Sequence, residues 1–180
     1  AIQVGVVADV SADESTLTLG GGKAANGMTN GVSIGYLAES NSHQSIAIGY
    51  RAVANSQYAD PAQPAVAIGA GANATGRGGV SLGLIANSSV RGTAIGSATQ
   101  ATGFGAFAGG TYAQATNAGD VAIGGASSDQ FNNYAVASGG YSVAIGTAAK
   151  ADGSAGVSIG YKTNAKTSNS LAVGRSEERR

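Results

Sequence analysis

The side chains that could carry out catalysis are few and scattered in this sequence. His43 is the only histidine among 180 residues, and cysteine is absent. A metal cluster of several imidazoles and a Ser-His-Asp set both need more than the chain offers, so neither is expected. His43 stands in the polar stretch 40–44, which we predict to be an exposed turn.

The carboxylates do not suggest a catalytic pair either. Glycoside hydrolysis requires two carboxylates that face one cleft, whereas Asp60, Asp120, Asp129 and Asp152 are far apart in the chain. Each lies in or beside a predicted turn, where Asp commonly accepts hydrogen bonds from its own backbone. The glycines that precede Lys23 lack the spacing of a phosphate-binding loop, and the glycine-rich calcium-binding repeat is absent. We therefore expect no catalytic residues, no cofactor and no metal.

The composition limits the class of protein further. Ten basic and ten acidic residues give a net charge of zero, and only 11% of residues are charged. Disordered chains need more charge than this, and nucleic-acid binding needs a basic surface. The apolar runs are too short to cross a bilayer, so we expect no membrane contact by these residues. Gly contributes 30 residues, without the three-residue period of collagen.

One five-residue motif recurs along the chain: any residue, an aliphatic or β-branched residue, Ala or Ser, an aliphatic residue, and Gly. Most neighbouring copies are 13 to 15 residues apart, so the period is about fourteen residues. We expect the motif glycines to end a strand where a positive φ or a close backbone approach is required. Weaker copies end at Gly20 and Gly110, and the nine good copies end at Gly35, Gly49, Gly69, Gly83, Gly96, Gly124, Gly146, Gly160 and Gly174.

Each repeat also contains a second segment that alternates small, polar and small residues, as in Ala72 to Ala74. Residues two apart share one face of a strand, so each repeat predicts two short strands. A helix is rejected because β-branched residues separated by one position match a period of two rather than 3.6. The sequence therefore predicts an all-β fold, a parallel β-solenoid or β-roll with 14-residue coils.

The alternation also predicts which side chains are inside. We expect the two aliphatic residues of each motif to point inward, opposite small residues of the second strand. The middle Ala or Ser would then point outward, where it either packs against another chain or merely suits a crowded roll. The predicted core residues are Val32, Ile34, Ile46, Ile48, Val66, Ile68, Val80, Leu82, Ile95, Val121, Ile123, Val143, Ile145, Val157, Ile159, Leu171 and Val173.

Two intervals between motif glycines are longer than the rest, with insertions near 57–64 and 127–141. Insertions in repeat proteins form loops on one face, which often bind ligands. We therefore predict that Tyr58, Asp60, Phe131 and Tyr134 face a ligand. Other tyrosines follow motif glycines, and they either anchor ligands or cover the corner of the roll; these are Tyr36, Tyr50, Tyr112 and Tyr161.

The motif Ser-Val-Ala-Ile-Gly at 142–146 and its repetition resemble the YadA-type head domain of the trimeric autotransporter adhesins. The resemblance implies a left-handed parallel β-roll that assembles as a homotrimer. It also implies a location on the surface of a Gram-negative bacterium, anchored in the outer membrane through a stalk and anchor outside this sequence. Heads of this family attach to host extracellular matrix proteins or cell-surface receptors, promote autoagglutination and contribute to virulence. The expected partners are thus two further copies of the chain and a host ligand.

The resemblance divides the chain into three parts: a cap or leading segment at 1–15, head repeats at 16–174, and the start of a neck at 175–180. The main alternative is a receptor-binding or structural β-solenoid segment of a phage tail fibre or spike. An ice-binding solenoid would need a flat array of threonines, and a polysaccharide-cleaving β-helix would need an acid cluster. Neither feature is found in the repeats.

Overall fold

A computed structural model describes residues 16–24, 29–56, 64–126 and 133–174. The chain forms two compact units, residues 1–91 (unit 1) and 92–180 (unit 2). The described residues contain 21 short strands and no helix. Each coil contributes one strand of three residues and one of two residues, as the two segments of each repeat predict. The all-β prediction is confirmed.

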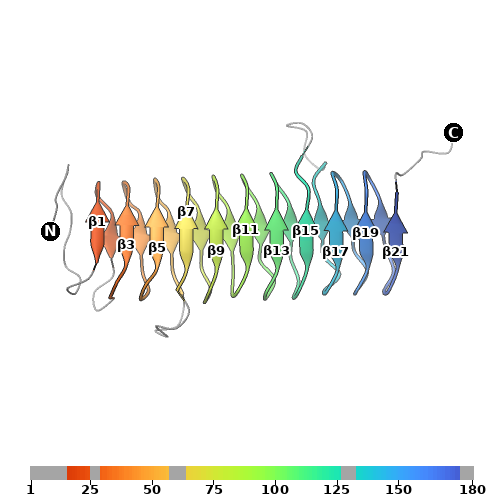
Figure 1. The fold of residues 1–180 in the computed structure, drawn as a ribbon, viewed down its shortest axis with the longest axis horizontal. Coiled ribbons are helices and arrows are strands. Elements are labelled where there is room, and N and C mark those ends of the chain that lie inside the picture. The colour runs from red at the N-terminus through yellow and green to blue at the C-terminus, as the bar shows by residue number, and fades with distance from the viewer. Residues whose placement is uncertain (1–15, 25–28, 57–63, 127–132, 175–180) are drawn as a thin grey trace. The chain divides into compact units, whose positions relative to one another are not determined.

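Unit 1 contains two parallel sheets, one of odd-numbered and one of even-numbered strands (Figure 1). The odd strands are β1 (Leu17–Leu19), β3 (Val32–Ile34), β5 (Ile46–Ile48), β7 (Val66–Ile68) and β9 (Val80–Leu82). The even strands are β2 (Lys23–Ala24), β4 (Glu39–Ser40), β6 (Val53–Ala54), β8 (Asn73–Ala74) and β10 (Asn87–Ser88).

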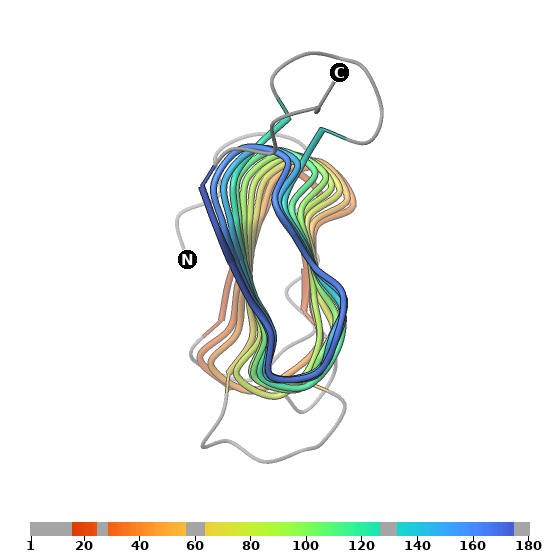
Figure 2. The same cartoon turned by 90° about the vertical axis from the view of Figure 1, so that its right-hand side faces the viewer.

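Unit 2 repeats the same arrangement. Its odd strands are β11 (Thr93–Ile95), β13 (Phe107–Gly109), β15 (Val121–Ile123), β17 (Val143–Ile145), β19 (Val157–Ile159) and β21 (Leu171–Val173). Its even strands are β12 (Gln100–Ala101), β14 (Gln114–Ala115), β16 (Val136–Ala137), β18 (Lys150–Ala151) and β20 (Asn164–Ala165). Figure 2 shows the coils of this unit as flattened loops with two long walls and a turn at each end.

Equivalent residues of successive coils pair directly. In unit 2, Val143 of β17 pairs with Val157 of β19, and Ala144 pairs with Ser158. In unit 1, Ala47 of β5 pairs with Ala67 of β7 across the first insertion. Identical columns of side chains therefore run from coil to coil, and the parallel β-solenoid with coils of about fourteen residues is confirmed.

The motif glycines end the odd strands, as predicted. All nine have positive φ, between 118° and 145°. At Gly49 a Cβ atom would also lie 2.6 Å from the carbonyl oxygen of Gly69 in the next coil. Both the backbone conformation and the close stacking of coils thus require Gly here.

The interior of the roll is different from the prediction. The middle Ala or Ser of the motif is fully buried in Ser33, Ala47, Ala67, Ser81, Ala94, Ala122, Ala144 and Ser158. By contrast, every residue of the predicted core is half-buried or exposed, and Ile68, Ile95 and Ile123 are 39%, 42% and 40% exposed. The alternation was predicted correctly, but the inward and outward faces of the odd strands are exchanged.

The two walls are close enough for their side chains to form hydrogen bonds across the interior. The hydroxyl of Ser81 on β9 donates a hydrogen bond to the carbonyl oxygen of Asn73 on the opposite wall, at 2.8 Å, and lies 2.8 Å from Ser88 Oγ. Ser158 likewise reaches Thr163 Oγ1 at 2.8 Å. The small residues of the second segments, such as Ala72 and Ala74, do point inward as predicted. Small residues therefore face small residues across a narrow interior.

Candidate functional site

The aliphatic side chains form two columns on the outer face of the odd-strand sheet in each unit. In unit 2, one column runs through Val121, Val143, Val157 and Leu171, and the other through Ile123, Ile145, Ile159 and Val173. Leu171 and Val173 are 71% and 67% exposed. Unit 1 has the equivalent columns, Val32 to Val80 and Ile34 to Leu82. We call these columns the aliphatic face.

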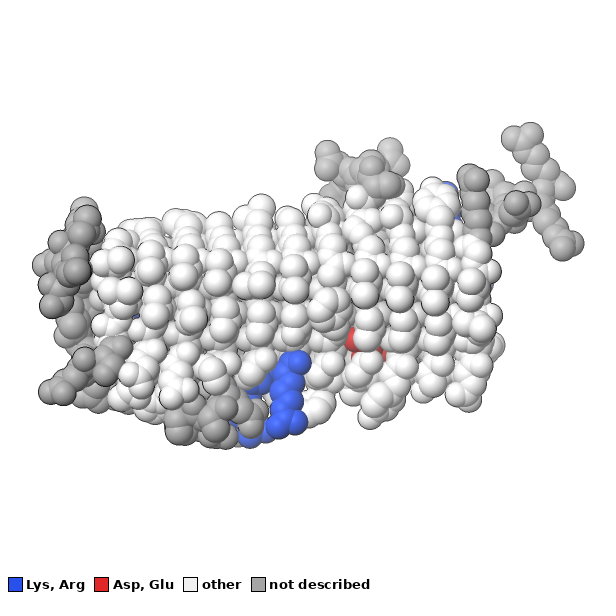
Figure 3. All heavy atoms as spheres, viewed as in Figure 1, with Lys and Arg blue, Asp and Glu red and all other residues white. Residues whose placement is uncertain are grey.

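The aliphatic face also lacks charge. Figure 3 views the side of the odd strands, where most of the described atoms are uncharged. The largest group of Lys and Arg lies at the lower edge, with a small patch of acidic atoms beside it and a few basic atoms at the upper right. Contiguous exposed apolar surface of this kind marks an interaction site in soluble proteins. The sequence had suggested contact with a partner through the Ala and Ser column. The structure buries that column and exposes the aliphatic columns instead.

The outer face of the even strands is mostly polar. Its outward positions are exposed or half-buried, and they hold Lys23, Glu39, Val53, Asn73 and Asn87 in unit 1, and Gln100, Gln114, Val136, Lys150 and Asn164 in unit 2. The two sheets of each unit thus present surfaces of opposite character. The apolar surface suits a protein partner, and the polar one suits water or a polar ligand.

The turn tyrosines are exposed and contact one another or a cation. The rings of Tyr36 and Tyr50 are stacked, with centroids 6.0 Å apart and planes 17° apart. Arg51 lies over the Tyr50 ring at 5.3 Å, and Lys162 over the Tyr161 ring at 5.2 Å. Tyr112 is exposed as well. These contacts fit both interpretations of the turn tyrosines, as corner covers and as ligand anchors.

Of the four predicted ligand-facing residues, Tyr58, Asp60 and Phe131 lie outside the described residues. Tyr134 is described and half-buried. Its hydroxyl accepts a hydrogen bond from Gln114 Nε2 at 3.2 Å, and its ring lies 6.1 Å from that of Tyr112. It lines a pocket together with Val136, Lys150 and Asp152. The regular strand β16 falls within 127–141, so the extra residues of this coil stand before it.

The remaining titratable candidates have structural contacts. His43 is half-buried, and its Nδ1 atom lies 3.0 Å from Thr29 Oγ1. Asp120 is fully buried, and its Oδ2 accepts a hydrogen bond from the backbone N–H of Asn117 in its own turn, at 2.9 Å. Its Oδ1 accepts from the N–H and the hydroxyl of Ser142 in the next coil, at 2.9 and 2.8 Å. The link between coils was missed, because the sequence suggested only a local turn contact.

The described part of the chain contains no group of three His, Cys, Asp or Glu residues that could hold a metal ion. Within the same residues, the structure has no helix of the length and hydrophobicity needed to cross a membrane.

Comparison with protein families identifies the chain. Residues 28–57, 62–84, 137–162 and 151–176 match the YadA head domain repeat, and these ranges cover more than half of the sequence. The chain therefore belongs to the YadA head domain family, as its motif suggested. This is a family of structural adhesin heads on surface-exposed autotransporters, not a family of enzymes. Comparisons with curated proteins and with solved structures gave no match.

Proposed function

We propose that this chain is the head of a homotrimeric surface adhesin, which attaches a Gram-negative bacterium to host extracellular matrix or host cells and promotes autoagglutination. The family supports an adhesin-type head. The single observation that supports the assembly is the aliphatic face. Two columns made mostly of Val, Ile and Leu lie outside the roll in each unit, and in unit 2 they also contain Thr93, Phe107 and Gly109.

Three copies that turn their aliphatic faces toward a common axis would remove these columns from water. Burial of a large aliphatic side chain contributes about 1.5–3 kcal/mol, so an Ile that is 40% exposed, such as Ile123, gains roughly 1 kcal/mol from a partner. Repeated over the columns of both units, this gain favours association. In this arrangement the rolls are left-handed, residues 175–180 lead into a neck, and the stalk carries the head away from the outer membrane.

Attachment is tested with the purified chain and with bacteria that display it. Wells coated with collagen, fibronectin or laminin should retain the protein above wells coated with albumin, and displaying cells should clump. The matched control is Ile123→Asp, which places a charge on the aliphatic face and should lower the mass in solution and the avidity together. Equal retention on albumin and on every matrix protein would reject attachment to host matrix.

The insertions are proposed to carry specificity. Deletion of 57–64 or of 127–132 should preserve the circular dichroism spectrum of the chain and reduce retention on the matrix protein that binds best. Unchanged retention of both deletion variants would show that the ligand contacts another part of the surface.

A further inference from the structure

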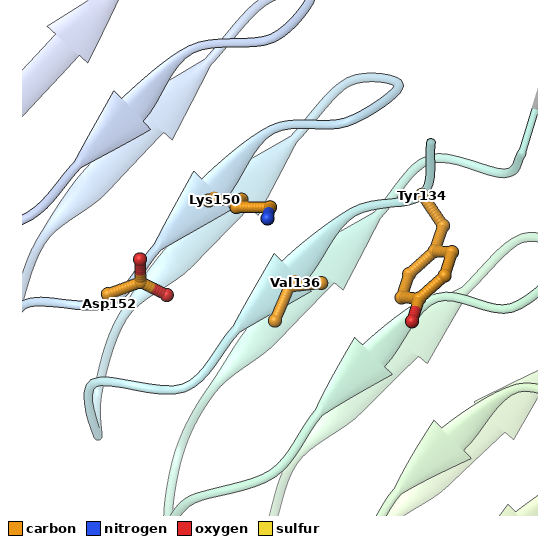
Figure 4. Close-up of a pocket in the computed structure, with 4 residues that line it drawn as sticks. All are labelled: Tyr134, Val136, Lys150 and Asp152. Atoms are coloured by element: carbon orange, nitrogen blue, oxygen red, sulfur yellow. The ribbon is translucent and has the colours of Figure 1, made fainter. Parts of the chain in front are cut away.

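A pocket of about 150 Å³ lies on the outer surface of the even-strand sheet in unit 2. Val136 on β16 and Lys150 on β18 are direct neighbours in the sheet. Tyr134 precedes β16, and Asp152 follows β18, so the pocket has an aromatic end and an acidic end (Figure 4). An aliphatic group and an ammonium group lie between them.

The aromatic end depends on the second insertion. In neighbouring coils the residue before the inward Ala or Thr has positive φ, as in Tyr112 and Lys162. Tyr134 occupies the equivalent place but is not among the residues with positive φ. The hydrogen bond from Gln114 and the contact with the Tyr112 ring hold its side chain at the pocket. Tyr134 thus adds an aromatic wall at a place where neighbouring coils have a turn residue with positive φ.

The two charged groups are available for a ligand. Among the residues that the structure describes, no hydrogen bond or ion pair engages the Lys150 ammonium. Asp152 Oδ1 accepts a hydrogen bond from Ser138 Oγ at 3.0 Å, which fixes the carboxylate and leaves Oδ2 for a donor. Because Lys150 and Asp152 are two residues apart on an extended backbone, their Cα atoms are separated by about 7 Å.

We propose that this pocket binds an acidic sugar residue, such as a terminal sialic or uronic acid. The carboxylate of the sugar pairs with Lys150, its hydroxyls donate to Asp152, and its C–H face packs on Tyr134 and Val136. An acidic peptide side chain can pair with Lys150 but has no donor for Asp152.

This inference deepens the proposed attachment function by naming a ligand class, and it rests on that function for its biological role. The pocket is on the even-strand sheet, whereas the aliphatic face is on the odd-strand sheet. Assembly through the aliphatic face would leave the pocket open and present one copy per chain. A weak single site then gains avidity from repetition.

The test measures binding to the full chain by saturation-transfer difference NMR. Three probes are used: methyl α-N-acetylneuraminide, methyl β-D-glucuronide and methyl β-D-glucoside. The acidic sugars should bind with a Kd on the order of 1 mM, as expected for one open site, and the glucoside about tenfold more weakly, because it lacks the charged hydrogen bond. Lys150→Gln should remove this preference, and Tyr134→Ala should remove binding of all three probes.

The matched controls are Lys162→Gln and Tyr161→Ala, which alter an exposed Lys and Tyr of the same unit away from the pocket. The proposal would be overturned by any of three results: an equal loss of sugar binding in these control variants, equal binding of the three sugars, or binding of a glutamate peptide in place of sugars. If the chain attaches to matrix-coated wells and Lys150→Gln changes nothing, the pocket fails and the adhesin function stands. If the acidic sugars bind but no coated surface retains the chain, the adhesin function fails instead.

Discussion

Substitution of Ala144 by Leu tests the inverted interior directly. Ala144 is fully buried in β17, and in the odd-strand sheet it lies between Ala122 and Ser158. Leu adds three carbon atoms to a space that is lined by methyl and hydroxyl groups. Overpacking of this kind costs about 1–3 kcal/mol. If Ala144 pointed outward, as the sequence had suggested, the larger side chain would meet no opposite wall.

The matched control is Ala155→Leu, which adds the same atoms at an exposed turn position with φ of 52°. Leu37 adopts a φ of 55° in an equivalent conformation, so Leu is compatible with the backbone there. Surface substitutions of this type change stability by about 0.5 kcal/mol or less. The difference in stability between the two variants isolates the free-energy cost of placing a larger side chain in the interior.

The assay is equilibrium urea unfolding, followed by circular dichroism at one fixed protein concentration, because self-association makes stability depend on concentration. With a urea m-value of about 2 kcal/mol/M, a loss of about 2 kcal/mol lowers the midpoint by about 1 M. Ala155→Leu should leave the midpoint within ~0.3 M of the parent chain. Equal midpoints for Ala144→Leu and the parent would refute the assignment of this column to the interior.

Three further predictions follow from the described contacts. Ile123→Asp on the aliphatic face should lower the mass in solution toward that of one chain, as measured by light scattering after size-exclusion chromatography. An unchanged mass would show that the chains do not associate through the aliphatic face. Asp120→Ala leaves the buried N–H of Ser142 without its partner and should lower the free energy of unfolding by about 1–3 kcal/mol. An unchanged urea midpoint would show that another acceptor replaces the carboxylate. Gly49→Ala should lower the thermal midpoint, because its Cβ would lie 2.6 Å from the Gly69 carbonyl oxygen. Gly105→Ala should lower the midpoint less, because no atom lies within 4 Å of its new Cβ. Equal losses in the two variants would show that the close approach of coils is not the cause.

The period of the repeat was enough to predict strand number per coil, parallel pairing and the role of the motif glycines. It did not determine which face of the odd strands is inside. The alternation is the same whether the aliphatic residues or the middle Ala and Ser residues point inward. The usual rule that branched aliphatics are buried within their own chain gave the wrong phase, because the roll places Ala and Ser inside and leaves the aliphatic side chains on the outer face. Size variation was the better signal. In the good copies the middle column contains only Ala and Ser, while the flanking positions accept Val, Ile, Leu and Thr93.

The candidate pocket was predictable only in part. Tyr134 was predicted to face a ligand because it lies in the second insertion, and in the structure it lines the pocket. Lys150 and Val136 are fourteen residues apart and meet only through the pairing of β16 with β18. Asp152 had been interpreted as a turn residue, and its hydrogen bond from Ser138 comes from the preceding coil. Contacts between neighbouring coils depend on register, which a pattern within one repeat does not contain.

The in-register stacking of coils has a consequence for how such a gene can change. Ala122, Ala144 and Ser158 occupy equivalent places, and each meets a residue of nearly the same size above and below. Loss or duplication of one 14-residue segment would bring together residues that already pair elsewhere in the unit. Because stability in repeat proteins is approximately a sum over repeats and their neighbours, recombination can alter the number of coils without a new interior having to evolve.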